Sequence, residues 1–194
     1  MTSLETILRQ VHIDLTDAHV SFALVGGLAV SARTEPRFTR DADLVVPVAN
    51  DAEAERLIHR LRDCNYGIEA VVEQQAVGRL ATVRLTRAPV ARAPVVDLLF
   101  ASSGIEPEVV AAAEPIDLLP NLRMAVATTG HLIALKVLSR DDVTRPQDLA
   151  DLRALLRVAA DADMAGARQA LKLIATRGYH RGRDLMADLD SLVT

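Results

Sequence analysis

Two aspartates separated by one residue, Asp41 and Asp43, stand at the start of an apolar run that continues to Val48. Residues i and i+2 of a β-strand project from the same face, so a strand here would place both carboxylates together. Without a counterion, such carboxylates would repel each other by roughly 1 kcal/mol. A divalent cation removes that penalty, and hard oxygen ligands suit Mg²⁺. The pair therefore predicts a magnesium site; the alternative is two solvated aspartates at a strand start.

A third aspartate, Asp97, interrupts the apolar run from Val95 to Phe100. A carboxylate in a buried strand is costly unless it is paired or bound to a metal. Asp97 is therefore either a third metal ligand or the partner of one of the chain's many arginines. As a ligand it would bind the ion that activates the attacking hydroxyl of a substrate, and it could also serve as the base.

Two glycines, Gly26 and Gly27, follow the apolar run 21–25 and precede a helical pattern. Glycines at such a junction let backbone N–H groups approach a phosphate, and the helix N-terminus favours negative charge. The alternative is an ordinary tight turn. A glycine turn, a carboxylate pair and a third carboxylate together are typical of a two-metal nucleotidyl-transfer site, in which the ions clamp the attacking and leaving oxygens of an in-line displacement.

The stretch GGLAVSARTEPRFTRDADLVV resembles the signature of the polymerase-β-type nucleotidyltransferase superfamily. More narrowly, the chain is similar to the AbiEii and MenT toxins of bacterial toxin–antitoxin pairs, over Gly26 to about Leu152. This resemblance implies Mg²⁺-dependent transfer, often of pyrimidine nucleotides from CTP or UTP, to the 3′ end of transfer RNA, which blocks aminoacylation. Many members of the superfamily have serine after the first glycine. Because this chain has Gly27 there, that phosphate contact must come from backbone amides or another residue.

Lys136 interrupts the apolar segment 132–138, in a chain that has one other lysine. Its compact ammonium could meet a triphosphate as a point charge, although a helix lysine can also extend to solvent. The segment LIALKVLSRDDVTRPQDLADL resembles the family's helical motif, in which a lysine and later acidic residues serve the nucleotide. That resemblance implies that Asp148 or Asp151 orients Lys136 or the nucleotide. The alternative is favourable placement of acids in the first turns of a helix.

A short polar segment before the aspartate pair contains Arg37, Thr39 and Arg40. An arginine here could bind phosphate oxygens bidentately, and Thr39 would share a strand face with Asp41 if the strand began early. We also expect Thr39 to lie at the mouth of the nucleotide pocket. Phosphorylation there, by a partner kinase or by self-modification, would add about −1.5 to −2 charges and repel the nucleotide. The alternative for all three residues is ordinary loop chemistry.

The spacing of apolar residues predicts a mixed sheet flanked by helices, an α/β (α+β) fold of the nucleotidyltransferase type. Strands are expected at 21–25, 41–48, 80–86 and 95–100, with a shorter pair at 116–119 and 123–126. Helices are expected at 3–18, 28–33 and 51–63, the last capped by Asp51. From residue 128 the period changes to 3.6, which predicts helices at 128–140, 146–159, 164–176 and 180–192, with Thr129 as a cap. We therefore predict a catalytic domain at 1–127 and a helical segment at 128–194 that completes the active site.

Half of the 194 residues are hydrophobic and a quarter are charged, as in globular proteins. No run of about 18 apolar residues could span a membrane, and the single Cys64 suits a reducing cytoplasm, so we expect a cytoplasmic protein. The net charge of −4 argues against a surface coated with nucleic-acid contacts. A basic cluster near the C-terminus could touch an RNA backbone or be a solvated helix junction: Arg177, His180, Arg181 and Arg183.

Three functions remain open. The leading one is a toxin that transfers a nucleotide to transfer RNA under the control of a cognate antitoxin. The second is the same chemistry on a hydroxyl of a protein or of a small molecule such as an antibiotic, which the acidic composition favours slightly. The third is a catalytically silent nucleotide-binding or antitoxin module, against which the intact Asp41, Asp43, Asp97 and Lys136 argue.

Overall fold

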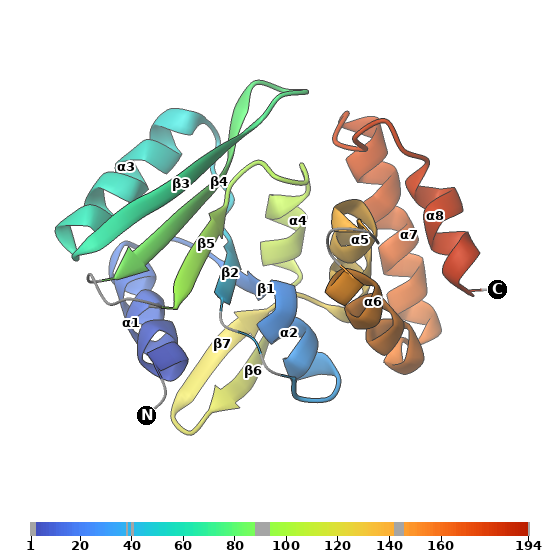
Figure 1. Ribbon diagram of the computed structural model, residues 1–194, viewed down its shortest axis with the longest axis horizontal. Coiled ribbons are helices and arrows are strands. Elements are labelled where there is room, and N and C mark those ends of the chain that lie inside the picture. Colours follow the sequence, from blue (N-terminus) through green and yellow to red (C-terminus); the bar gives the residue numbers. More distant parts are fainter. Residues whose placement is uncertain (1–2, 38, 40, 88–93, 142–145, 194) are drawn as a thin grey trace.

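A seven-stranded mixed sheet forms the centre of the protein, with strand order β3-β4-β5-β2-β1-β7-β6 (Figure 1). The computed structural model describes residues 3–37, 39, 41–87, 94–141 and 146–193, so the predicted phosphate contact Arg40 lies outside the described residues. The pairs β2–β5 and β1–β7 are parallel and the others are antiparallel. The strands are β1 (Ala23–Val25), β2 (Asp41–Val45), β3 (Tyr66–Gln74), β4 (Arg79–Arg87), β5 (Val95–Leu99), β6 (Glu114–Leu119) and β7 (Leu122–Val126).

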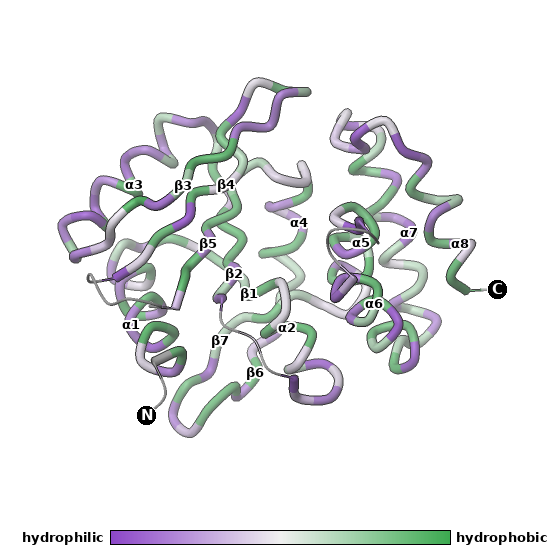
Figure 2. Tube along the Cα trace, viewed as in Figure 1, coloured by the Kyte–Doolittle hydropathy of each residue, from purple (hydrophilic) through white to green (hydrophobic). Residues whose placement is uncertain are grey.

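Six of these strands agree with the sequence predictions, and β3 does not appear among them. β3 lies at the edge of the sheet, and almost all of its side chains are exposed. An edge strand with exposed residues on both faces has no reason to show the period-two alternation on which strand prediction rests. The central strands β1, β2 and β5 are largely buried, which matches their apolar composition (Figure 2).

Eight helices are found in the described part of the chain, of which the short α4 was not predicted. Helix α2 begins at the first glycine of the glycine turn rather than at Leu28, so the turn is also the first turn of the helix. The helices are α1 (Ser3–Asp17), α2 (Gly26–Arg33), α3 (Asp51–Asp63), α4 (Glu106–Ala111), α5 (Thr129–Ser139), α6 (Pro146–Val158), α7 (Asp161–Thr176) and α8 (Leu185–Val193).

Two predicted caps are wrong by one residue each, and the predicted starts of the last two helices are wrong by a few residues: the helix predicted from 164 begins at Asp161. Asn50, not Asp51, caps α3, since its Oδ1 accepts the Glu53 N–H. Thr128, not Thr129, caps α5, since its Oγ1 accepts the N–H of His131. The helix predicted from residue 180 begins at Leu185, because residues 181 and 182 both have positive φ, a backbone conformation that cannot continue an α-helix.

Helix α5 is the centre of the C-terminal helices and joins them to the sheet domain. Its residues Leu132, Ile133 and Val137 are almost completely buried, and it packs against α6, α7 and α2. Helices α5–α8 gather on one side of the sheet, opposite α1 and α3 (Figure 1). None of the helices in the described ranges is long and apolar enough to cross a membrane.

Candidate active site

The register of the sheet brings two predicted site residues, Asp43 and Asp97, into one row. Asp43 of β2 lies beside Asp97 of β5, and Asp97 lies beside Arg84 of β4. On the other side of Asp43 is Val25, the last residue of β1, directly before the glycine turn. Two strands far apart in sequence are therefore parallel neighbours, and this adjacency places the carboxylates together.

A cavity of about 700 Å³ covers this row of residues. Strand ends and the glycine turn line it on one side, and helix α5 and the start of α6 line it on the other. Of the predicted site residues in the described part of the chain, Asp151 is the one that does not line the cavity, although it contacts two residues that do. The predicted site residues in the lining are Gly26, Gly27, Arg37, Thr39, Asp41, Asp43, Asp97, Lys136 and Asp148.

The two glycines have different neighbours. Gly26 has a φ of +64°, and a Cβ added to it would overlap the carboxylate of Asp43. A Cβ on Gly27 would meet the guanidinium of Arg37 and would lie 3.2 Å from the hydroxyl of Thr39. Arg37 and Thr39 thus fill the space into which a side chain at position 27 would project.

We expect Gly26→Ala to lower activity strongly, because the new methyl group must displace the Asp43 carboxylate and because φ is positive at this position. Gly78→Ala is the matched control. Gly78 also has a positive φ, of +62°, but nothing lies within 4 Å of its added Cβ. Both variants place alanine at a positive φ and should lose stability in chemical denaturation, and Gly26→Ala should lose more because its methyl group overlaps Asp43. If Gly26→Ala keeps the activity of Gly78→Ala, the close approach to Asp43 is irrelevant to function.

Asp97 forms an ion pair with Arg84. The guanidinium donates from Nε to Oδ1 at 2.9 Å and from Nη2 to Oδ2 at 2.7 Å. This hydrogen-bonded carboxylate, together with the charges of Asp41 and Asp43, raises the pKa of Arg84 above its ordinary value. The structure thus shows the arginine pairing that was the alternative to metal ligation by Asp97. Among the residues that the structure describes, no three acidic, histidine or cysteine side chains converge closely enough to hold a metal ion.

Lys136 contacts two buried carboxylates. Its Nζ lies 2.6 Å from Oδ1 of Asp148 and 2.8 Å from Oδ2 of Asp151, and the lysine is 8% exposed. Arg37 also pairs with Asp151, with Nε 2.7 Å from Oδ1. Burial alone would raise the pKa of the Asp151 carboxyl, but the hydrogen bonds from Arg37 and Lys136 outweigh it and hold that pKa below its ordinary value. Both predicted acids therefore contact Lys136, and Asp151 connects Lys136 to Arg37.

The basic residues near the C-terminus do not form one patch. Arg177 pairs with Glu108 of α4, and Arg183 pairs with Asp188 at 2.7 Å. Arg181 is the member of this group that lines the cavity. The predicted cluster is thus divided between structural ion pairs and one residue at the site.

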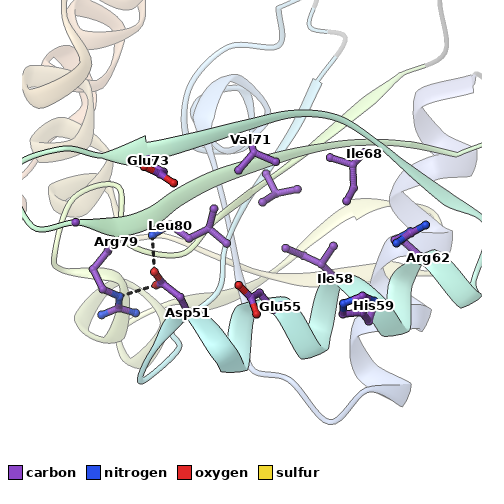
Figure 3. Close-up of a pocket in the computed structure, with 12 residues that line it drawn as sticks. Asp51, Glu55, Ile58, His59, Arg62, Ile68, Val71, Glu73, Arg79 and Leu80 are labelled. Carbon is purple, nitrogen blue, oxygen red and sulfur yellow. Dashed lines mark hydrogen bonds and ion pairs between the residues drawn. The ribbon is translucent and has the colours of Figure 1, made fainter.

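A second cavity, of about 360 Å³, lies between α3 and the β3–β4 hairpin (Figure 3). Asp51, one of its acidic residues, accepts hydrogen bonds from Nε of Arg79 and from the backbone N–H of Leu80 (Figure 3). None of the predicted site residues lines this cavity. The site residues predicted from the sequence therefore gather at the first cavity, which we call the carboxylate cavity, and not at this one.

Sequence reasoning missed Arg84 and two serines of the cavity lining, Ser102 and Ser103. Both serines donate hydrogen bonds to Oε1 of the buried Glu106 at the start of α4, which holds their loop in place. Arg84 did leave a signal, because it is a charged residue in the middle of the alternating strand RLATVRLTR. Its pairing with Asp97 could not be inferred without the order of the strands.

The chain matches the family model described as "Nucleotidyl transferase AbiEii toxin, Type IV TA system" over residues 7–193. Among solved structures it is similar to an antigenic nucleotidyltransferase-like protein from Paracoccidioides brasiliensis, with a TM-score of 0.54 and 20% identity, covering 97% of this chain and 92% of that chain. It is also similar to the antibiotic-resistance factor ANT(2″)-Ia, with a TM-score of 0.53 and 15% identity, covering 91% and 97% of the two chains. No match is found among curated protein sequences. The predicted fold class, a mixed sheet flanked by helices of the nucleotidyltransferase type, is confirmed.

Proposed function

Because this chain belongs to the AbiEii family of nucleotidyltransferase toxins, we propose that it transfers a nucleoside monophosphate, preferentially from CTP or UTP, to the 3′ end of transfer RNA. This modification would block aminoacylation and stop translation. The observation that carries the proposal is the position of the carboxylates of Asp41, Asp43 and Asp97 beside the glycine turn, in one cavity. A cognate antitoxin would control the toxin, and the site of action would be the cytoplasm.

In the proposed reaction the terminal hydroxyl of the acceptor attacks the α-phosphate of the nucleoside triphosphate. A new P–O bond forms, the bond to the bridging oxygen of the β-phosphate breaks, and pyrophosphate leaves. Backbone N–H groups at Gly26 and Gly27, at the N-terminus of α2, would bind the phosphates. Arg37 and Thr39 would supply the side-chain contacts, and an oxygen of Asp97 would take the proton of the attacking hydroxyl.

Asp41, Asp43 and Asp97 would hold Mg²⁺, whose chemical contribution when bound is to neutralise charge on the reacting phosphates. Carboxylate oxygens are the donors that this ion prefers. Asp41 and Asp43 both line the cavity and fit this role. Asp97 would share its carboxylate between the ion and Arg84, since both of its oxygens accept hydrogen bonds from that arginine.

Lys136, Asp148 and Asp151 would act from the other side of the cavity. Lys136 and Asp148 line it, and Asp151 holds Arg37 next to the glycine turn. We propose that the segment 128–194 completes the active site in this way, against a catalytic domain at 1–127. Lys136 would add a positive charge near the triphosphate while its two carboxylate partners keep it oriented.

A protein or small-molecule acceptor is the second candidate. Two observations favour it: the fold is shared with the antibiotic-resistance factor ANT(2″)-Ia, which has been solved in complex with adenylyl-2″-tobramycin, and the net charge of −4 is unusual for an RNA-binding protein. The two acceptors can be separated by experiment.

The test is to incubate the protein with each of the four nucleoside triphosphates, labelled at the α-phosphate, together with Mg²⁺ and total cellular RNA. Label that migrates with transfer RNA, strongest with CTP or UTP, is the expected result. Label on protein would favour the second candidate. If no macromolecule or added small molecule is labelled, the chain is a binding module rather than a transferase.

Control by phosphorylation would act through Thr39. Its hydroxyl lies next to the glycine turn, 3.2 Å from a Cβ built on Gly27, and Thr39 lines the cavity. A phosphate there would compete with the nucleotide for Arg37 and repel the incoming triphosphate. We therefore expect Thr39→Glu to be inactive and Thr39→Val, which is similar in size but uncharged, to keep substantial transfer activity.

An active Thr39→Glu enzyme would count against control by charge. Intact-mass spectra of the protein co-expressed with its neighbouring gene product would show directly whether a phosphate is added. The expected mass increase is that of one phosphoryl group, and it should disappear in Thr39→Val. A partner kinase and self-modification are distinguished by repeating the measurement with the purified protein and nucleoside triphosphate alone.

A further inference from the structure

Arg84 is a cationic side chain of the cavity to which the proposed reaction assigns no role. It comes from β4, where it lies opposite Asp97 in the antiparallel register. The side chain of Asp97 is 10% exposed, whereas that of Arg84 is 44% exposed. The carboxylate is therefore enclosed by the protein, while its partner reaches solvent and can move away without unfolding the sheet.

The guanidinium occupies both oxygens of the carboxylate at once, at 2.9 Å and 2.7 Å. A bidentate pair of this kind is among the stronger side-chain interactions. A cation that uses Asp97 as a ligand needs at least one of these oxygens. Because Asp43 is the next residue in the same row, Arg84 and such a cation would also repel each other across a short distance.

We propose that Arg84 competes with a divalent cation for the Asp97 carboxylate and thereby weakens cation binding; we call this arginine the latch. Arg84 is then a positioning residue that sets the affinity of the cation site and keeps Asp97 neutralised when no cation is bound. This inference rests on the proposed function only in that the reaction uses a cation at these aspartates.

The test measures cation binding without any turnover. Mn²⁺ is titrated into the protein in the absence of nucleotide, and free Mn²⁺ is followed by electron paramagnetic resonance. We expect Arg84→Gln to bind Mn²⁺ at least about tenfold more tightly than the unmodified protein. Arg79→Gln is the matched control: Arg79 is on the same strand and pairs with Asp51 at 2.7 Å, but it lies outside the carboxylate cavity. It should leave Mn²⁺ affinity unchanged.

A second variant separates the latch from the general effect of removing a positive charge. In Arg84→Gln/Asp97→Asn, compared with Asp97→Asn alone, the gain in Mn²⁺ affinity should disappear, because the gain depends on the Asp97 carboxylate. A purely long-range effect of the arginine charge would persist in this comparison. Thermal unfolding gives an independent readout. Arg84→Gln leaves Asp97 without its counterion, so the melting temperature of this variant without Mn²⁺ should be lower than that of the unmodified protein. On addition of Mn²⁺, the melting temperature of the variant should rise more than that of the unmodified protein.

Equal Mn²⁺ affinity of Arg84→Gln and the unmodified protein would overturn the latch, as would a gain that survives Asp97→Asn. The result is distinct from the outcome for the proposed function. If the gain is found but no nucleotide is ever transferred, the latch stands and the assigned activity fails. If transfer is found but the gain is absent, the activity stands and Arg84 is a structural ion pair.

Discussion

Asp43→Asn is expected to lower nucleotide transfer by about 10²- to 10³-fold or more, the range that follows removal of one preorganised electrostatic group from an active site. Asparagine has nearly the same size and shape as aspartate but lacks the negative charge that would hold Mg²⁺ beside the phosphates. Asp43 lies in the middle of the row formed by β1, β2 and β5. Loss of its charge should therefore impair nucleotide transfer, and cells that express the variant in place of the unmodified protein should show no growth arrest.

The control for this variant is Asp117→Asn. Asp117 is on β6, its side chain is 79% exposed, and it does not line the cavity. Both variants should have the circular dichroism spectrum of the unmodified protein. Full activity in Asp43→Asn would contradict the mechanism. We expect similar losses for Asp41→Ala and Asp97→Ala, since all three carboxylates line the cavity.

Lys136→Ala is expected to impair both stability and nucleotide use. The substitution removes the ammonium that pairs with both Asp148 and Asp151, which are nearly completely buried, and Arg37 stays as a partner of Asp151 alone. Breaking a buried ion pair in this way typically costs about 3–5 kcal/mol of unfolding free energy. Lys136→Arg should rescue little, because a fork-shaped guanidinium does not fit a site that holds a compact ammonium between two carboxylates.

Lys172→Ala provides the comparison for Lys136, since it removes the chain's other lysine from an exposed position on α7. Chemical denaturation and the KM for the nucleoside triphosphate are measured on all variants. If Lys136→Ala is as stable as Lys172→Ala, the buried network contributes nothing to folding. If Lys136→Arg has the turnover of the unmodified protein, any positive charge suffices at this position.

The sequence was sufficient to predict the carboxylate pair, the glycine turn and most elements, because each depends on local pattern. Asp41 and Asp43 face one way as residues i and i+2 of a strand, and Asp97 stands out as a charge in an apolar run. The parallel pairing of β2 with β5, by contrast, joins strands with three elements between them in the chain. No local pattern encodes that neighbour relation.

The same reason explains why the contacts of Asp97 and of Lys136 could not be assigned from the sequence. Arg84 meets Asp97 only because β4 lies on the far side of β5, so metal ligation and arginine pairing could not be distinguished beforehand. Lys136 and Asp151 lie on different helices, and Arg37 reaches Asp151 from the sheet side. The family resemblance implied that the acids serve the lysine or the nucleotide. The packing of α5 against α6 was needed to show that both acids contact Lys136.

The most direct test of nucleotidyl transfer compares label in the α-phosphate with label in the γ-phosphate of the same nucleoside triphosphate, using transfer RNA as the acceptor. Attack at the α-phosphate keeps the α label on the RNA and releases the γ label as pyrophosphate. We predict that only the α label appears on the RNA, and that Asp43→Asn abolishes it. Transfer of the γ label would identify a kinase instead, and the absence of both labels from every acceptor would contradict the proposed activity.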